Sequence, residues 1–208
     1  MQKGLFITFE GGEGAGKTTL IEEIEKTFRK KGHSVLKTRE PGGTKLGEEI
    51  RSLLLEHKEP ISPFSELCLF LASRAQHIQE VIRPALKKGK VVLCDRFNDS
   101  SIAYQGAARG LGVREVKKFC KFISEDLKPE LTFYLDLDPK VGLKRASNIG
   151  AHDRIESEAI EFHKKIRSAF LRIHRNEPKR FMIVDASLSP HTVFQTAMKT
   201  IDHIFRHV

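Results

Sequence analysis

A glycine-rich stretch near the start of the chain has the residues and the spacing of a phosphate-binding loop. It runs from Gly11 to Thr18 with the pattern G-x-x-x-x-G-K-T, after an apolar run at residues 5–9 and before a helical pattern. Glycines let successive backbone N–H groups converge on phosphate oxygens, and the following helix adds the positive end of its dipole. Lys17 can reach the β- and γ-phosphates of a nucleotide, and the Thr18 hydroxyl can ligate Mg²⁺. The pattern predicts a nucleoside-triphosphate site, in preference to a structural turn that happens to contain a lysine.

Polar side chains follow the next predicted strands. Arg39 and Glu40 come at the end of a short strand, and Asp95 and Arg96 come at the end of a later apolar run. Because the carboxyl ends of strands in an open parallel sheet face the ligand crevice, these side chains are expected beside the phosphate loop. Asp95 is then a second candidate ligand for Mg²⁺. Arginines on this edge could clamp a second anion, as a kinase for a small phosphorylated acceptor requires.

The hydrophobic pattern predicts an α/β protein with a P-loop NTPase fold. The predicted strands are residues 4–9, 34–38, 91–95, 131–136 and 181–185. Because these strands alternate with helical segments, we expect a five-stranded parallel sheet with helices on both faces. Residues 1–208 are expected to form a single domain, since the chain shows no repeat or linker.

Two helix boundaries and a small lid are also predicted. The long helix that follows Pro63 is expected to end between Pro84 and Gly89. Asp153, with a glutamate three residues later, resembles a capping box for a helix that begins at the next residue. The small, non-amphipathic residues 146–152 read as a mobile loop within a lid at about 145–154. Lys17 is expected to be exposed in the empty crevice.

The composition limits the partners and the compartment. The chain carries 36 lysine and arginine residues against 27 acidic residues, a formal net charge of +9. Its lysine clusters lack interleaved aromatic residues, so phosphorylated small molecules are expected as partners and nucleic acid is not. No apolar run approaches the roughly 20 residues of a membrane span, so no membrane partner is expected. Three cysteines without metal-ligand spacing are expected to be reduced, which predicts a cytoplasmic protein.

Four segments of the chain resemble bacterial thymidylate kinases. They are residues 9–19, 38–44, 95–106 and 153–156. The first is shared with many NTPases, whereas the T-R-E-P-G-G-T and A-Y-Q-G sequences of the second and third are specific to the family. The resemblance implies transfer of the γ-phosphate of ATP to dTMP, with Mg²⁺ as cofactor, by an enzyme that is usually a homodimer.

The resemblance also implies roles for individual residues. The expected ATP-binding residues are Gly11, Gly12, Glu13, Gly14, Ala15, Gly16, Lys17, Thr18, Thr19 and Arg145. The expected dTMP-binding residues are Glu13, Arg39, Arg51, Phe70, Arg74, Arg96, Ser101, Tyr104 and Gln105. Phe70 would stack on thymine, and Arg74, four residues later on the same helix face, would bond a thymine carbonyl. Ser101 and Gln105 would lie around the base, and Tyr104 would occupy the space of a ribose 2′-hydroxyl.

Residue types alone leave several of these assignments open. Phe70 lies on an apolar helical stripe, where a phenylalanine is more often part of the core. Arg51 lies on an amphipathic helix, where an arginine is usually solvated, and Tyr104 could simply pack. The resemblance implies that Arg39, Arg51 and Arg96 gather at the acceptor phosphate. It places Glu13 at the 3′-hydroxyl side of the sugar.

The chain departs from the family at the arginine that clamps the transferring phosphoryl group. Family members commonly carry this arginine in the phosphate loop or the lid, but neither this phosphate loop nor residues 146–152 contain one. We expect Arg154 to take the role and Arg145 to lie near the nucleotide base. The expected catalytic residues are Lys17, Asp95, Arg96 and Arg154. Two alternatives stay open: a kinase for another nucleoside monophosphate, and a P-loop regulatory protein that binds nucleic acid.

Overall fold

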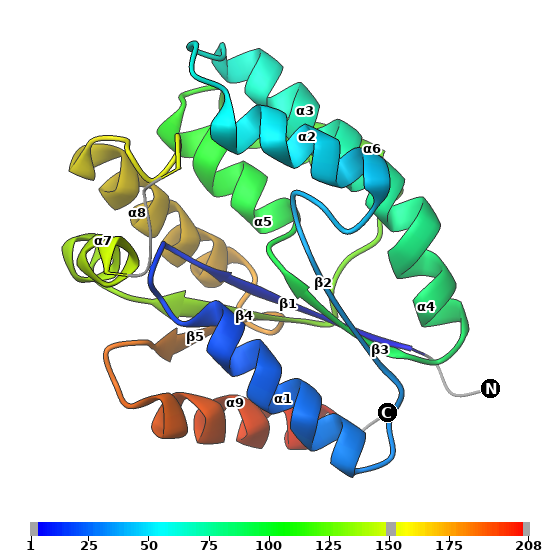
Figure 1. Ribbon diagram of the computed structural model, residues 1–208. Coiled ribbons are helices and arrows are strands. Elements are labelled where there is room, and N and C mark those ends of the chain that lie inside the picture. Colours follow the sequence, from blue (N-terminus) through cyan, green and yellow to red (C-terminus); the bar gives the residue numbers. More distant parts are fainter. Residues whose placement is uncertain (1–3, 149–152, 206–208) are drawn as a thin grey trace.

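The computed structural model describes residues 4–148 and 153–205, and a sheet of five parallel strands forms its centre (Figure 1). The strands are β1 (Leu5–Gly11), β2 (Val35–Arg39), β3 (Val91–Asp95), β4 (Leu131–Asp136) and β5 (Phe181–Asp185). Their order across the sheet is β2-β3-β1-β4-β5. β1 is the central strand and pairs with β3 on one side and β4 on the other. The predicted five-stranded parallel sheet is therefore confirmed; near-continuous apolar runs are typical of strands that are buried on both faces.

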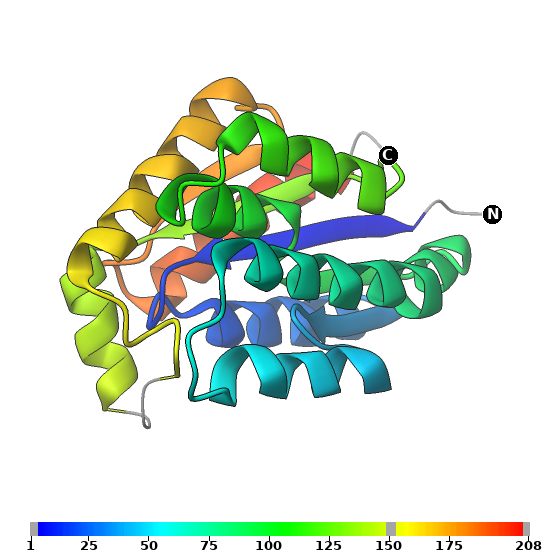
Figure 2. The same cartoon turned by 90° about the horizontal axis from the view of Figure 1, so that it is seen from above.

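Helices cover both faces of this sheet (Figures 1 and 2). The helical segments are α1 (Lys17–Lys30), α2 (Lys45–Glu56), α3 (Pro63–His77), η1 (Ile78–Ile82), α4 (Arg83–Lys87), α5 (Asn98–Ser101), η2 (Ile102–Ala108), α6 (Val113–Ile123), α7 (Pro139–Ser147), α8 (Ile160–Asn176) and α9 (Pro190–Phe205). η1 and η2 have the wider turns of a π-helix. α1 packs on α9 at one face, while η2 packs on α6 and α8 at the other. The predicted α/β class is thus confirmed.

The side chains of β1 alternate between two buried layers. Ile7 and Phe9 are fully buried in the cluster that includes α1 and α9. Phe6 faces the other way, with its ring centroid 5.0 Å from that of Phe97. Burying a side chain of this size stabilises the fold by about 1.5–3 kcal/mol. By the same alternation, Glu10 lies on the Phe6 side, and this carboxyl group is completely buried.

The long helix after Pro63 ends where the sequence predicts. α3 passes into η1 and then α4, which ends at Lys87, between Pro84 and Gly89. The N–H group of Arg83 donates to the carbonyl of Ile78, five residues earlier. Proline lacks the N–H that an α-helical bond would use, but it is tolerated in the first turn of a helical segment. The change to π-helical bonding before Pro84 therefore lets the helix run past it.

The segment after residue 153 differs from its prediction. The Asp153 carboxylate accepts hydrogen bonds from the backbone N–H groups of Ile155 at 2.8 Å and Glu156 at 2.9 Å. The backbone N–H of Asp153 in turn donates to the Glu156 carboxylate at 3.3 Å. These are the bonds of a capping box. However, residues 154–157 form turns, and α8 begins later. The helix start predicted at Arg154 is wrong: the chain turns first, and the N–H of Arg154 donates to the carbonyl of Leu55 in α2.

The predicted lid loop falls partly outside the described residues. α7 extends to Ser147, so the first two residues assigned to a mobile loop are helical. Residues 149–152 lie outside the described part of the chain, and the lid stays a prediction there.

Candidate active site

The phosphate loop connects the end of β1 to the start of α1. Gly14 and Gly16 have φ angles of 64° and 87°, in the left-handed region that favours glycine. A Cβ at residue 14 would also collide with the backbone oxygen of Gly142 in α7. The loop conformation therefore favours glycine at both positions; the motif spacing indicates Gly16, whereas Gly14 lies at one of its variable positions.

Lys17 points back into this loop. Its Nζ donates to the carbonyl oxygens of Gly11 at 3.3 Å and Gly12 at 3.1 Å, and the residue is 8% exposed. Burial lowers the pKa of Lys17, as does the neighbouring charge of Arg96, while nearby carboxylates oppose both effects. The expectation of an exposed lysine is wrong, because the ammonium group finds its acceptors within the loop itself.

A large cavity opens beside the loop at the carboxyl ends of β2 and β3. The residues that line it are Glu13, Gly14, Ala15, Gly16, Lys17, Thr18, Thr19, Ile21, Leu36, Lys37, Thr38, Arg39, Glu40, Gly43, Glu48, Arg51, Val81, Asp95, Arg96 and Arg145. Arg39, Arg51 and Arg96 thus line one space, and their roles at an acceptor phosphate stay predictions. Burial lowers the pKa of Arg51, and the like charges of Arg39 and Arg96 lower it further. An anion in this space would relieve that repulsion.

Asp95 and Thr18 border the same cavity and fit a magnesium ion. The Oδ1 atom of Asp95 is buried, and no hydrogen-bond partner for it exists within the described part of the chain. A buried carboxylate oxygen without a donor is a suitable ligand for a hard cation. Among the described residues, no group of three or more His, Cys, Asp or Glu side chains could hold a metal. The donor set therefore suits Mg²⁺ that is held mainly by phosphates and water, with one or two protein oxygens.

Arg96 connects the cavity to a neighbouring pocket. Its φ angle is 68°, which is unusual for a residue with a side chain and is a form of strain found at functional sites. The guanidinium donates to the Glu13 carboxylate at 2.6 Å and to the Tyr104 hydroxyl at 3.0 Å. Burial raises the pKa of Glu13, but the charges of Arg96 and Lys17 outweigh it and leave the pKa below its ordinary value. Arg96 and Glu13 therefore form an ion pair between the two spaces.

The pocket on the other side of Arg96 has about 590 Å³ of empty volume. Its lining consists of Glu13, Glu40, Pro41, Arg51, Leu55, Phe70, Arg96, Ser100, Ser101, Tyr104, Gln105, Asp153, Ile155 and Glu156. We call it the acceptor pocket. Seven of the nine residues predicted to bind dTMP border it, and an eighth, Arg39, borders the adjoining cavity.

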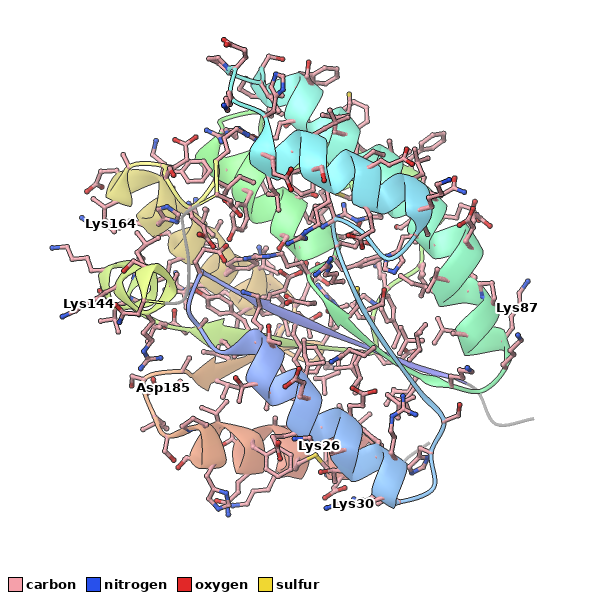
Figure 3. The ribbon with its side chains drawn as sticks, in the orientation of Figure 1. Lys26, Lys30, Lys87, Lys144, Lys164 and Asp185 are labelled. Atoms are coloured by element: carbon pink, nitrogen blue, oxygen red, sulfur yellow. The ribbon has the colours of Figure 1, made fainter. Side chains whose placement is uncertain are left out.

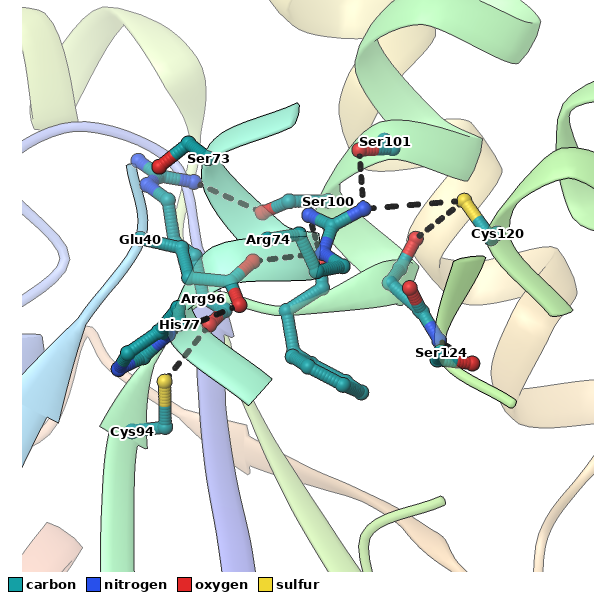
Figure 4. A network of polar contacts seen from close by, with 12 residues as sticks. Glu40, Ser73, Arg74, His77, Cys94, Arg96, Ser100, Ser101, Cys120 and Ser124 are labelled. Carbon is teal, nitrogen blue, oxygen red and sulfur yellow. Dashed lines mark hydrogen bonds and ion pairs between the residues drawn. The ribbon is translucent and has the colours of Figure 1, made fainter. Parts of the chain in front are cut away.

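Arg74 is the predicted dTMP-binding residue that lines neither space. It is 1% exposed and donates to the Glu40 carboxylate at 2.6 Å, to Ser101 Oγ at 2.9 Å and to the Phe97 carbonyl at 3.0 Å (Figure 4). Glu40 also contacts His77 Nδ1 at 3.1 Å. The guanidinium of Arg74 thus donates to two residues that line the acceptor pocket, Glu40 and Ser101, without lining the pocket itself. Its contact with a base stays a prediction.

The two arginines at the ends of the predicted lid lie in different places. Arg145 lines the cavity of the phosphate loop and donates to the Ala186 carbonyl at 3.2 Å. Arg154 is bound to the Glu66 carboxylate at 2.7 Å and to the Leu54 carbonyl at 2.9 Å, and it lines neither space. Its predicted role in phosphoryl transfer would require it to leave these partners.

Sequence reasoning missed Glu10, which supports the turn that follows Arg96. Its carboxyl group accepts from the backbone N–H of Phe97 at 2.9 Å and of Ser100 at 3.3 Å, and from Ser100 Oγ at 2.5 Å. Burial, with the nearby charge of Asp99, raises the pKa of Glu10 to about 8. A glutamate inside an otherwise apolar strand was the available signal, since a buried carboxyl group requires specific partners.

Lysines lie on several of the helices. Figure 3 labels Lys26 and Lys30 on α1, Lys87 on α4, Lys144 on α7 and Lys164 on α8. None of the described helices has the length and apolar character needed to cross a bilayer.

Comparisons with known proteins agree with this geometry. Residues 9–197 match the family model for thymidylate kinase. The chain is 53% identical to a thymidylate kinase of Protochlamydia amoebophila, over 96% of this chain and 93% of that protein. It is 49% identical to a thymidylate kinase of Deinococcus radiodurans, with 90% and 91% covered. The crystal structure of a thymidylate kinase from Ehrlichia chaffeensis is similar, with a TM-score of 0.78, 32% identity and coverage of 96% and 99%.

Proposed function

This chain belongs to the thymidylate kinase family, and we propose how its own residues carry out the reaction of that family. It is a nucleoside monophosphate kinase that transfers the γ-phosphate of ATP to dTMP and yields dTDP for nucleotide biosynthesis. The observation that carries the assignment of residues is the pair Glu13 and Arg96, which borders the phosphate-loop cavity and the acceptor pocket together.

ATP would bind with its phosphates on the loop at residues 11–18. The left-handed glycines and the N-terminus of α1 support this assignment, as does Lys17, which can exchange its loop carbonyls for phosphate oxygens. Arg145 would lie on the nucleoside side of ATP, since it also borders a second hollow between α1 and α9. Thr18 and Asp95 would hold Mg²⁺, which supplies neutralisation of phosphate charge when it is bound.

dTMP would bind in the acceptor pocket with its phosphate toward the arginines. Arg39, Arg51 and Arg96 border the space between the pocket and the phosphate loop, which supports a role at the acceptor phosphate. Phe70 lines the same pocket and would stack on the base. Tyr104 is 6% exposed beside Arg96 and would lie against the deoxyribose, where it would exclude a 2′-hydroxyl.

The chemistry requires positioning more than a base. The second pKa of a phosphate monoester is about 6, so the acceptor is largely dianionic at neutral pH and needs no strong general base. The barrier comes from bringing two anions into line. Lys17 and Arg96 lie where they can neutralise both phosphates and hold them at reacting distance.

The activity is tested by measuring ADP release from ATP and Mg²⁺ with and without dTMP. We expect turnover that depends on dTMP and is much weaker with other nucleoside monophosphates in a panel. An equal rate of ADP release with and without dTMP would overturn the proposal. A higher rate with another nucleoside monophosphate would identify that compound as the acceptor instead. Omission of Mg²⁺, with a chelator present, should abolish turnover if Thr18 and Asp95 hold the ion.

We also propose that the enzyme is a cytoplasmic homodimer that pairs through α3 and α6. Phe64 and Phe119 contact each other edge-on, with centroids 6.2 Å apart, while 54% and 44% exposed. Phe122 is 79% exposed on the same helix as Phe119. A second copy of this face would bury these rings. The three cysteines are free thiols, which fits a reducing compartment.

Light scattering coupled to size exclusion tests the dimer. Phe122→Glu should shift the protein toward the monomer, since a carboxylate would be buried between the copies. Leu188→Glu, at another exposed apolar residue, is the matched control and should leave the mass unchanged. A wild-type protein of monomer mass at micromolar concentration would contradict the proposal.

A further inference from the structure

The buried carboxylate of Glu66 does not line the acceptor pocket but accepts a hydrogen bond from a residue that does. Glu66 of α3 is fully buried and receives a two-point contact from Arg109, with Nε at 3.2 Å and Nη2 at 3.1 Å. Arg154 donates to the same carboxylate at 2.7 Å, and the Gln105 side-chain amide donates to it at 2.8 Å. Of these four residues, only Gln105 lines the acceptor pocket. Glu66 thus connects a pocket residue to two arginines behind it.

The two arginines keep Glu66 ionised. Burial by itself raises the pKa of Glu66, but the hydrogen bonds from Arg109, Gln105 and Arg154 outweigh it and leave the pKa below its ordinary value. The arginines are themselves held in place. Arg109 lies over the Phe162 ring at 4.5 Å, and Arg154 is tied to the end of α2. These contacts connect α3, η2 and the turn before α8, segments that approach one another in Figure 2.

An ionised Glu66 allows one orientation of the Gln105 amide. A carboxylate only accepts hydrogen bonds, so the amide must present its nitrogen to Glu66. The amide oxygen, on the other side of the same planar group, accepts no hydrogen bond from the described residues. Because Gln105 is 1% exposed and lines the pocket, its oxygen is available there as an acceptor. A neutral residue in place of Glu66 would permit the opposite orientation.

We propose that Glu66 is a positioning residue that selects the base by fixing the Gln105 amide with its oxygen toward the acceptor pocket. The inference rests on the proposed function. A pyrimidine with an N–H at ring position 3, such as thymine or uracil, can donate to this oxygen. Cytosine has an unprotonated nitrogen at that position and would oppose one acceptor with another. A site built to bond one group rejects an analogue that lacks it far more strongly than an apolar pocket can.

The test compares kcat/KM for dTMP and dCMP in the wild type and in Glu66→Gln. The variant amide can donate to the Gln105 oxygen, so Gln105 can turn its nitrogen toward the pocket. We expect the preference for dTMP over dCMP to fall by about tenfold or more. Glu158→Gln removes the other carboxylate partner of Arg109 without touching Gln105, and it should keep the wild-type preference. A merely structural role of Glu66 would lower both kcat/KM values together and leave their ratio unchanged.

Two further variants keep the proposal falsifiable. Gln105→Met removes the amide while Glu66 and its arginines remain, and it should lose the same preference. In the double variant, Glu66→Gln should add no further loss, because it acts through Gln105. If Gln105→Met retains the wild-type ratio, the amide does not read the base and the proposal is overturned. If the wild type fails to phosphorylate dTMP at all, the proposed function fails first, and that result is distinct from an unchanged ratio in an active enzyme.

Discussion

The phosphate loop and the acceptor pocket are neighbours that are built by opposite means. The loop is a continuous stretch, residues 11–18, and offers backbone groups whose direction is set by left-handed glycines. The acceptor pocket takes its lining from Glu13 of that loop, from the segments that follow β2 and β3, and from α2, α3, α5, η2 and the turn before α8. Backbone groups bind phosphate whatever nucleoside it carries. Side chains brought from distant segments can distinguish one acceptor from another, so selectivity belongs to the second region.

Their electrostatics differ in the same way. In the phosphate loop, Lys17 donates to two carbonyl oxygens of its own loop, and these are easily exchanged for a ligand. Around the acceptor pocket, buried carboxylates hold arginines in ion pairs, as Glu40 holds Arg74 and Glu66 holds Arg154. Breaking a buried pair leaves an uncompensated charge and typically costs about 3–5 kcal/mol. We therefore expect Lys17 to exchange its partners more readily than Arg74 or Arg154.

The largest expected effect lies in the phosphate loop. Lys17→Ala should lower kcat by about 10³-fold or more, because no other side chain of the loop can neutralise the transferring phosphoryl group. Binding of dTMP, measured by calorimetry, should change little, since Lys17 does not line the acceptor pocket. A comparable loss of dTMP affinity would break the contrast between the two regions. Near-wild-type turnover would contradict the assignment of residues 11–18 as the loop that binds the phosphates of ATP.

A smaller effect is expected from Tyr104, which belongs to the acceptor side. Tyr104→Ala should narrow the gap in kcat/KM between dTMP and its ribose counterpart by about tenfold, because space opens for a 2′-hydroxyl. Tyr104→Phe keeps the ring and removes only the hydroxyl bonded to Arg96, so it should keep that gap while lowering kcat modestly. If the ribose gap is unchanged in Tyr104→Ala, the residue only packs against its aromatic neighbours.

Substitution of the two arginines at the ends of the predicted lid should affect the KM of a different substrate in each case. Because Arg154 is bound to Glu66 and the end of α2, Arg154→Ala should raise KM for dTMP by about tenfold or less and leave KM for ATP nearly unchanged. Arg145→Ala, the matched variant on the other side, should raise KM for ATP instead. A fall of about 10³-fold in kcat for Arg154→Ala would show that it swings over the phosphates during transfer.

The last expected effect concerns stability and not turnover: a pH dependence that arises from Glu10. Its pKa is about 8 in the folded protein and 4.5 in an ordinary glutamate. Between these values the folded protein keeps a proton that the unfolded chain has lost, so stability falls as the pH rises through this range.

The comparison of Glu10→Gln with the wild type isolates that effect. The amide mimics the protonated acid and can keep the bonds to the turn after Arg96, so the variant's Tm should fall less between about pH 5.5 and pH 8.5. The difference should be on the order of 10 °C. Glu161→Gln, at an exposed glutamate, should follow the wild-type profile. Parallel profiles for all three proteins would mean that Glu10 is ionised throughout.

Much of this protein could be read from the sequence because the relevant patterns are local. The five strands follow from apolar runs, and the phosphate loop follows from glycine and lysine spacing. Asp95 and Arg96 could be placed beside that loop because parallel strands end at one edge of a sheet. The family motifs added the acceptor-side residues, seven of which border one pocket.

Only the tertiary structure decided which partners the charged side chains take. Arg74 and Phe70 lie one helical turn apart and share a predicted face, yet one is buried in an ion pair with Glu40 and the other lines the pocket. The capping box at Asp153 forms its local bonds, but α8 begins only at Ile160, and Arg154 bonds to α2. Short-range patterns specify backbone conformation through neighbouring residues. The partner of a buried charge is chosen by which carboxylate or carbonyl the folded chain brings within reach, and sequence spacing carries no record of that.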